Sequence, residues 1–260
     1  MNLSLQGKTA LVCGSTQGIG WATAMELASM GAKVVLLARN EEKLSKRVAE
    51  LPGDANHSYL VADFSNTAEV KQTIETWVAN GNTANILVNN TGGPPAGPIV
   101  NATQDEFRSA FEAHLINNHN ITLALIPGMK STGYGRVVNV ISTSVKIPLP
   151  NLGVSNTVRG AVANWSKTLA NELAPFGITV NNVLPGATET ERLASIISNK
   201  ATKTGISEEE AANKMTSEVP MKRFAKPEDV AAAIAFLSSP AARYITGIYI
   251  PVDGGRTGCY

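Results

Sequence analysis

The chain has only two cysteines, Cys13 and Cys259, among its 260 residues, which excludes a disulfide framework. Cys13 ends an apolar segment, where a free thiol behaves as a small buried hydrophobe, and this usage fits a reducing compartment. No apolar stretch approaches the ~20 residues that a membrane-spanning helix needs, and the run Thr9–Cys13 is too short for a signal-peptide core. We therefore expect a cytoplasmic protein with no membrane partner.

An excess of charge of one sign is also missing. The formal net charge is +1, from 22 Lys and Arg against 21 Asp and Glu, and the basic residues form no run. A nucleic-acid or anionic membrane partner would require a basic patch or stripe, so neither is expected. The expected partners are a small-molecule substrate and other copies of the same chain, and no metal site is predicted.

Short runs rich in Val, Ile and Leu alternate with amphipathic stretches of helical length. The expected strands are Thr9–Cys13, Lys33–Ala38, Ser58–Ala62, Ile86–Val88, Val137–Ile141, Thr179–Val183 and Tyr249–Val252. The expected helices are Gly20–Met30, Glu41–Leu51, Glu69–Asn80, Glu106–Lys130, Val154–Leu173 and Pro227–Ser238. Strands that are apolar on both faces indicate a parallel sheet covered by helices. The pattern predicts one α/β domain over residues 1–260, a doubly wound, Rossmann-type, three-layer α/β/α sandwich.

Residues 188–220 break this alternation. The segment is polar, charged and helix-prone, and Ser207 followed by three glutamates is typical of a helix start. An insertion after the carboxyl end of a strand is where a substrate-covering flap would lie, so we call residues 188–220 the flap segment. A surface helical pair without function is the alternative interpretation.

A glycine-rich turn directly follows the first expected strand and opens the first helix. It contains Gly14, Thr16, Gln17, Gly18, Ile19 and Gly20. Three glycines let the backbone turn tightly and approach a pyrophosphate held at the helix N-terminus. A plain strand-to-helix turn is the alternative. The glycine spacing, with downstream segments over essentially the whole chain, resembles the short-chain dehydrogenase/reductase family, and specifically its 3-oxoacyl-ACP-reductase-like members.

The downstream segments of the resemblance all follow expected strands. Asp63 and Phe64 resemble the pair that touches the adenine ring, and Asn90, Thr91 and Gly92 resemble the Asn-Ala-Gly part of the family's turn after the fourth strand. Pro185 and Gly186, with Thr188, resemble the segment that receives the nicotinamide amide. The resemblance thus implies a dinucleotide along the carboxyl edge of the sheet.

Arg39 ends the second strand, where an acidic residue would hold the ribose hydroxyls of NAD. A guanidinium there can instead pair with a 2′-phosphate and stack on adenine. NADP(H) is therefore the preferred cofactor, with NAD(H) possible and a solvated surface arginine as the alternative interpretation.

The catalytic row departs from the family pattern. The family places a serine, a tyrosine thirteen residues later, a lysine four beyond that, and an asparagine on the preceding long helix. The aligned positions hold Ser142, Ser155, Arg159 and His114. No tyrosine or lysine lies between Pro148 and Ser166, so the chain resembles a divergent member without the catalytic tyrosine and lysine.

The substitutions change the available chemistry. A serine hydroxyl is a far weaker acid than the phenol, and an arginine does not change protonation state in use, although Arg159 can still donate hydrogen bonds to the nicotinamide ribose. Ser142 is expected to polarise a substrate carbonyl. His114 titrates near neutral pH when unperturbed and is the leading replacement acid/base, but a neutral histidine that fills the asparagine's space is equally compatible.

Three functions remain open on the sequence alone. The favoured one is an atypical NADP(H)-dependent oxidoreductase acting on a carbonyl or alcohol. The second is a catalytically silent NADP(H)-binding protein, such as a sensor or partner subunit. The third is a non-redox enzyme similar to the halohydrin dehalogenases, which keep the tyrosine and abandon the glycine turn, the reverse of this chain. The resemblance also implies a homotetramer or dimer, and we expect a homotetramer.

Overall fold

The apolar runs form one parallel β-sheet in the computed structural model, which describes residues 1–258. The strands are β1 Thr9–Cys13, β2 Lys33–Ala38, β3 Ser58–Val61, β4 Ile86–Asn89, β5 Gly135–Val140, β6 Ile178–Pro185 and β7 Tyr249–Val252. They lie in the order β3-β2-β1-β4-β5-β6-β7. Val12 on β1 is in register with Leu36 on β2 and Val88 on β4, and all three are fully buried. The chain reverses its winding direction between β1 and β4, which is the edge where such sheets bind ligands.

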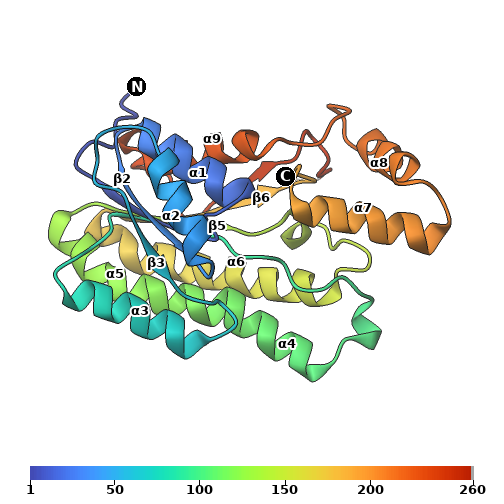
Figure 1. The fold of residues 1–260 in the computed structure, drawn as a ribbon, viewed down its shortest axis with the longest axis horizontal. Helices are drawn as coiled ribbons and strands as arrows, with labels where there is room; N and C mark the ends of the chain where they lie inside the picture. Colours follow the sequence, from blue (N-terminus) through green and yellow to red (C-terminus); the bar gives the residue numbers. More distant parts are fainter. Residues whose placement is uncertain (259–260) are drawn as a thin grey trace.

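Helices cover both faces of the sheet (Figure 1). The α-helices of residues 1–258 are α1 Gly18–Ser29, α2 Glu41–Glu50, α3 Thr67–Ala79, α4 Gln104–Phe111, α5 Asn117–Thr132, α6 Gly153–Leu173, α7 Glu191–Thr204, α8 Glu208–Ser217 and α9 Pro227–Ser238. One apolar cluster joins the sheet to α1, α2 and α9, and a second joins its other face to α3, α5 and α6. The expected doubly wound, three-layer α/β/α domain is confirmed.

The expected helix over 106–130 forms, but it contains a π-helical turn. After α4, residues Glu112–Ile116 form η2, a π-helical turn, and α5 follows it. The extra residue of a π turn makes the helix bulge, and this stretch has no proline or glycine that would signal the bulge. His114 lies at the centre of the turn and is only 2% exposed. The bulge therefore shapes the surroundings of one of the expected catalytic residues.

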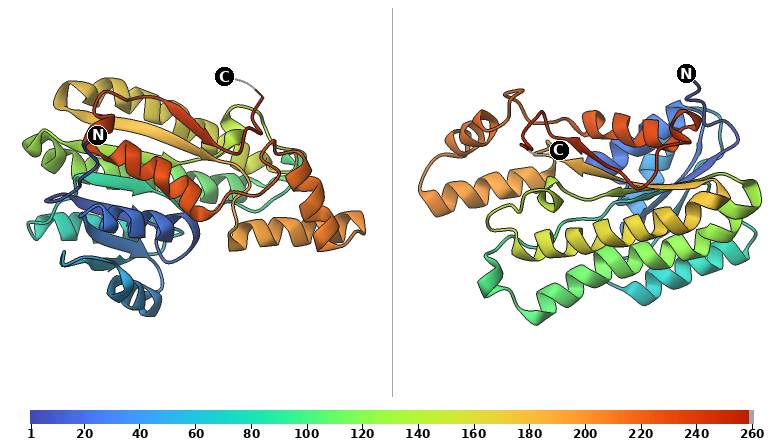
Figure 2. Two further views of the ribbon diagram at one scale, coloured as in Figure 1. Left: turned by 90° about the horizontal axis from the view of Figure 1, so that it is seen from above. Right: turned by 180° about the vertical axis from the view of Figure 1, so that it is seen from behind.

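The flap segment forms α7 and α8, which project beyond the carboxyl ends of the strands (Figure 2). The start of the flap segment meets the chain five residues after its end, at the body of the domain. Thr188 and Ala225 form an isolated parallel bridge, in which the Glu189 N–H donates to the Ala225 carbonyl at 2.9 Å. The Ala225 N–H in turn donates to the Ala187 carbonyl at 2.9 Å. The flap thus leaves and rejoins the domain at adjacent points.

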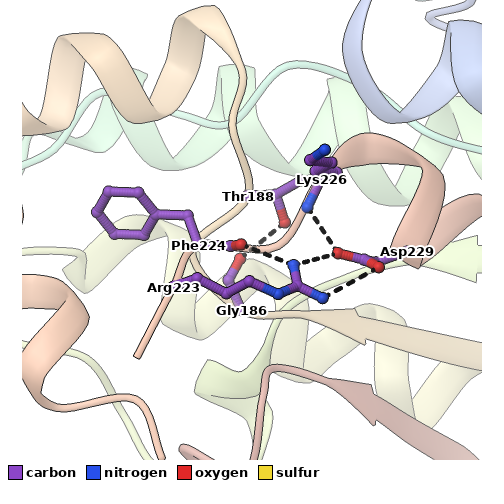
Figure 3. A network of polar contacts seen from close by, with 6 residues as sticks. All are labelled: Gly186, Thr188, Arg223, Phe224, Lys226 and Asp229. Carbon is purple, nitrogen blue, oxygen red and sulfur yellow. Dashed lines mark hydrogen bonds and ion pairs between the residues drawn. The ribbon is translucent and has the colours of Figure 1, made fainter. Parts of the chain in front are cut away.

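An ion pair lies beside this bridge at the start of α9 (Figure 3). Arg223 donates from its two terminal nitrogens to the two carboxylate oxygens of Asp229, at 2.6 and 3.3 Å. The Lys226 N–H donates to the same carboxylate at 2.8 Å, which satisfies a free amide of the first helical turn. These contacts hold residues 223–226, which follow the flap segment, against the start of α9.

Candidate active site

A cavity of about 1650 Å³ runs along the carboxyl edge of the sheet and continues under the flap segment. All but one of the expected site residues line it. They are Gly14, Thr16, Gln17, Gly18, Ile19, Arg39, Asp63, Phe64, Asn90, Thr91, Gly92, His114, Ser142, Ser155, Arg159, Pro185, Gly186 and Thr188. Gly20, the exception, packs behind the turn. Because α7 contributes side chains such as Leu193 and Ile196 to the wall, the flap segment lies where a substrate cover is expected.

The glycine turn is packed so tightly that a side chain does not fit at Gly14 or Gly20. Gly14 has a φ of +59°, and a Cβ there would lie 2.7 Å from the Asn90 carbonyl oxygen. A Cβ on Gly20 would lie 2.2 Å from the Gly14 carbonyl oxygen. The Asn90 amide donates to the carbonyls of Cys13 and Gly14 at 3.2 and 3.3 Å, which joins the turn to the end of β4. Arg47 on α2 donates from Nε to the Thr16 carbonyl at 3.1 Å. Glycine is therefore required here by close backbone approach.

The N-terminus of α1 is open for an anion. Its cap residue, Gln17, makes no capping hydrogen bond, and the first turn contains no acidic residue. The Gln17 amide instead donates to Glu191 at the start of α7, at 2.8 Å. By contrast, α2 and α3 are capped by Asn40 and Asn66. Free N–H groups and the positive end of the helix dipole together make the α1 terminus suited to a phosphate group.

The far end of the cavity combines two basic side chains with one carboxylate. Arg39 and Lys43 line the wall after β2, and Asp63 lines it after β3. The Ser65 N–H donates to Asp63 Oδ1 at 2.9 Å and holds the pKa of this carboxyl below its usual value, with the charge of Arg39 acting in the same direction. An ionised Asp63 beside an exposed Arg39 leaves a polar end that suits an adenosine with its phosphate.

The four residues of the catalytic row all line this cavity. Ser142 lies two residues after β5 and accepts a hydrogen bond from the Ser144 N–H at 3.1 Å. Arg159, one turn after Ser155 on α6, donates from Nη1 to the Val140 carbonyl at 2.7 Å. Burial lowers the pKa of Arg159 to about 10, and the charge of Arg192 adds to the effect. Within residues 1–258 the Ser155 hydroxyl has no hydrogen-bond partner and remains available to a ligand.

His114 is buried beside this row. Burial lowers its pKa to about 2, and the charge of Arg159 acts in the same direction, against a weaker opposing effect of its hydrogen bond to the Gly92 backbone. The imidazole is therefore neutral at physiological pH. A neutral imidazole donates from one nitrogen and accepts at the other, so His114 can orient a ligand or a water molecule. This environment does not support an imidazolium acid, and the role of His114 remains a prediction.

Sequence reasoning missed three basic residues. Arg47 fixes the glycine turn, Lys43 adds a second cation near Arg39, and Arg192 lies near Arg159. Each belongs to a helix, where a basic residue is usually a solvated surface group. Only Arg192 carried a signal, because it comes four residues after Thr188, in a segment already assigned to the site.

Other expectations concern groups outside the cavity. Cys13 is fully buried, and burial raises the pKa of its thiol to about 12, which makes it unreactive, while Cys259 lies outside the described residues. Across residues 1–258, none of the helices combines the length and apolar character needed to cross a bilayer. The same part of the chain contains no cluster of three or more His, Cys, Asp or Glu side chains arranged to hold a metal ion.

Comparison with known proteins gives consistent matches over the whole chain. Residues 14–257 match the family model described as Enoyl-(Acyl carrier protein) reductase. An uncharacterized oxidoreductase of Thermotoga maritima is 34% identical over 261 residues, covering 98% of this chain and 99% of that protein. A 3-oxoacyl-acyl-carrier-protein reductase of Vibrio cholerae is 31% identical over 255 residues, covering 97% of this chain and 98% of that protein.

Solved structures agree with these matches. L-Sorbose reductase from Gluconobacter frateurii, in complex with NADPH and L-sorbose, superposes with a TM-score of 0.92 at 29% identity, covering 100% of both chains. A 3-ketoacyl-(acyl-carrier-protein) reductase from Brucella melitensis, in complex with NADH, superposes with a TM-score of 0.84 at 35% identity. That match covers 98% of this chain and 100% of the other.

Proposed function

The chain belongs to the short-chain dehydrogenase/reductase family, and on this premise we propose that it is an NADP(H)-dependent oxidoreductase of carbonyl or alcohol substrates with an atypical catalytic row. One observation carries the proposal. The tight glycine turn, the uncapped start of α1 and the buried Arg159 all border one cavity. A dinucleotide site uses a tight glycine turn together with a free helix N-terminus, which a purely structural turn does not need.

The residues along the cavity fit a phosphorylated dinucleotide. The α1 terminus would hold the pyrophosphate, and Arg39 with Lys43 would hold the 2′-phosphate, because no acidic residue ends β2. A Cβ at Gly92 would meet nothing within 4 Å, so the backbone there is open to a ribose. Thr188, whose hydroxyl donates to the Gly186 carbonyl at 3.2 Å, would lie beside the carboxamide. Relatives solved with NADPH support this preference, although one is solved with NADH.

The chain's own residues would handle the substrate oxygen. Bound nicotinamide supplies or accepts the hydride. Ser142 and Ser155 border the reacting centre with hydroxyls that can donate to a carbonyl oxygen, and Arg159 adds a fixed positive charge that stabilises developing negative charge. Neutral His114 can hold a water molecule through its accepting nitrogen. In this arrangement the proton comes from solvent water held by the row and not from a titrating side chain.

The second candidate, a silent NADP(H)-binding protein, is favoured by one specific observation. None of the four residues of the row titrates near neutral pH, since His114 stays neutral and Arg159 keeps its charge. The family's acid/base step has no direct replacement here. A sensor or partner subunit would keep the cofactor cradle and lose turnover.

One assay separates the two candidates. Wild type, His114→Ala and the restored variant Ser155→Tyr/Arg159→Lys are compared for NADPH oxidation on one panel of ketones and aldehydes. Turnover by wild type supports the oxidoreductase. Turnover by the restored variant alone supports the silent protein, which has then left this chemistry.

Cofactor choice is tested by titration calorimetry with NADPH and NADH. We expect NADPH to bind more tightly, and Arg39→Ala to weaken NADPH by about ten- to a hundredfold, the loss of one charge-assisted contact, while NADH binding changes little. Equal affinity for both cofactors in wild type would refute the assignment of Arg39. Binding of neither cofactor would refute the proposed function itself.

Self-association and a cytoplasmic location remain predictions. Trp165 on α6 donates to His119 on α5 at 3.3 Å, and Leu123 on α5 is 48% exposed. These helices form an outer face of the molecule that offers apolar area for a partner copy. Light scattering at several protein concentrations measures the oligomeric state, and a monomer at all concentrations contradicts the expected homotetramer.

A further inference from the structure

Two arginines share the substrate end of the cavity without any acidic partner. Arg159 is only 9% exposed, and the half-buried Arg192 is close enough for its charge to lower the pKa of Arg159. Across residues 1–258 neither guanidinium forms an ion pair. Each has one hydrogen bond to a backbone carbonyl, from Arg159 to Val140 and from Arg192 to Pro94 at 2.6 Å. Most of their N–H groups remain free.

The acidic side chains of the cavity wall are engaged elsewhere. Glu191 accepts from Gln17, Glu218 pairs with Arg256 at 2.7 Å, and Asp105 pairs with Arg108. The other three carboxylates form no ion pair with the two arginines either. Asp63 and Glu106 accept backbone hydrogen bonds, and the charge of Glu189 helps to raise the pKa of Arg223. Two neighbouring guanidiniums that are partly removed from water repel each other, and a bound anion would offset both the repulsion and the desolvation.

Arg192 contacts the loop after β4, and within residues 1–258 none of its hydrogen bonds is with the glycine turn. It lies over Gly93, where a Cβ would meet its Nε at 3.5 Å, and it donates to Pro94, so its guanidinium lies beside the loop after β4. The residues that face the glycine turn are instead Thr190, 3.1 Å from the Cβ position of Gly18, and Glu191. This placement assigns Arg192 to the substrate and not to the pyrophosphate.

We propose that Arg192, supported by Arg159, binds the carboxylate of the substrate, which is therefore a short oxo acid or the corresponding hydroxy acid. This inference rests on the proposed function. In the reduction, the ketone carbon receives a hydride from the reduced nicotinamide and the oxygen receives a proton from water, while the carboxylate is unchanged. Lys200 and Lys203 on the cavity side of α7 add positive potential along the route to the site. A guanidinium recognises a carboxylate through two parallel hydrogen bonds.

The test measures binding of an anion against its neutral ester. Oxamate, acetoacetate and their methyl esters are titrated by calorimetry into protein saturated with NADP⁺ and into the free protein. We expect at least one anion to bind ten- to a hundredfold more tightly than its ester, the ratio that corresponds to ~1.5–3 kcal/mol for a charged hydrogen bond. In Arg192→Gln this preference should disappear, in Arg192→Lys it should be partly kept, and NADPH affinity should change less than threefold in both.

The matched control is Arg243→Gln, which removes the same charge from an exposed position outside the cavity and should leave every affinity unchanged. If neither anion binds better than its ester, or if Arg192→Gln weakens NADPH as much as the anion, the assignment is wrong. Failure of NADPH to bind at all would refute the proposed function. The anion titration of the free protein does not depend on cofactor binding, so it still tests the assignment of Arg192.

Discussion

The buried imidazole of His114 makes a quantitative prediction about stability against pH. The native pKa is lowered to about 2 from an ordinary value of 6.5, mainly because the side chain is removed from water. Below pH 6.5 the unfolded chain binds a proton at this position and the native protein does not. The contribution of His114 to the free energy of unfolding is therefore fully present above pH 6.5 and is lost as the pH falls below that value.

The size of the effect follows from linkage. Between pH 7 and pH 5 the unfolded histidine goes from mostly neutral to almost fully protonated, and the native one stays neutral. The free energy of unfolding should fall by about 2 kcal/mol from this one residue over that interval. The figure depends only on a native pKa well below 5, so it is insensitive to the exact shift.

The assay is urea denaturation of wild type and His114→Asn at pH 7 and pH 5, at one protein concentration. The quantity compared is the change between the two pH values within each protein, which removes any constant effect of the substitution. The variant should lose about 2 kcal/mol less than wild type over this interval. An identical pH dependence in both proteins would show that His114 protonates in the native state, and the neutral role derived for it would be wrong.

Two further predictions concern the glycine turn and the flap. Gly20→Ala places a methyl group against the Gly14 carbonyl, so we expect about 1–3 kcal/mol of destabilisation in thermal melts and weaker NADPH binding; Gly160→Ala, in an open position on α6, should instead stabilise by about 0.5–1 kcal/mol. Asp229→Asn removes the charge that Arg223 binds beside the flap base, and hydrogen exchange should become faster over the flap segment.

For each of these predictions, one result would contradict the reasoning. An unchanged melting temperature and unchanged cofactor affinity in Gly20→Ala would show that the turn adapts to a side chain. For the flap, Asp105→Asn is the control, because it breaks an ion pair with Arg108 on exposed α4 away from the flap base. If both aspartate variants leave exchange in the flap segment unchanged, the ion pair does not anchor it.

The sequence was most informative where burial alone determines structure. β1, β2, β7 and α9 begin and end at the expected residues, because their apolar periodicity coincides with the limits of the core. The π-helical turn at η2 was not predictable. It depends on how α4 and η2 pack against α6 and on the space that His114 fills, and Glu112–Ile116 contains no residue that disfavours an α-helix strongly.

The residues of the candidate site also divide into those that the sequence could predict and those that it could not. Residues that follow strands, such as Asn90 and Ser142, could be gathered from the sequence because the ends of parallel strands meet at one edge. Arg47 and Lys43 could not, because the positions of these side chains depend on how α2 is placed. The ionisation of His114 is also invisible in a sequence, since it follows from burial and from the neighbouring charge of Arg159.

The bridge between Thr188 and Ala225 has a consequence for how such a protein diversifies. A loop whose two ends are already paired can grow or shrink at small entropic cost, since each doubling of its length costs only about 0.6 kcal/mol. Insertions, deletions and exchanges between the paired ends need not disturb the sheet or the coenzyme cradle. Evolution can thus change which substrates enter the cavity by replacing only the residues between Thr188 and Ala225.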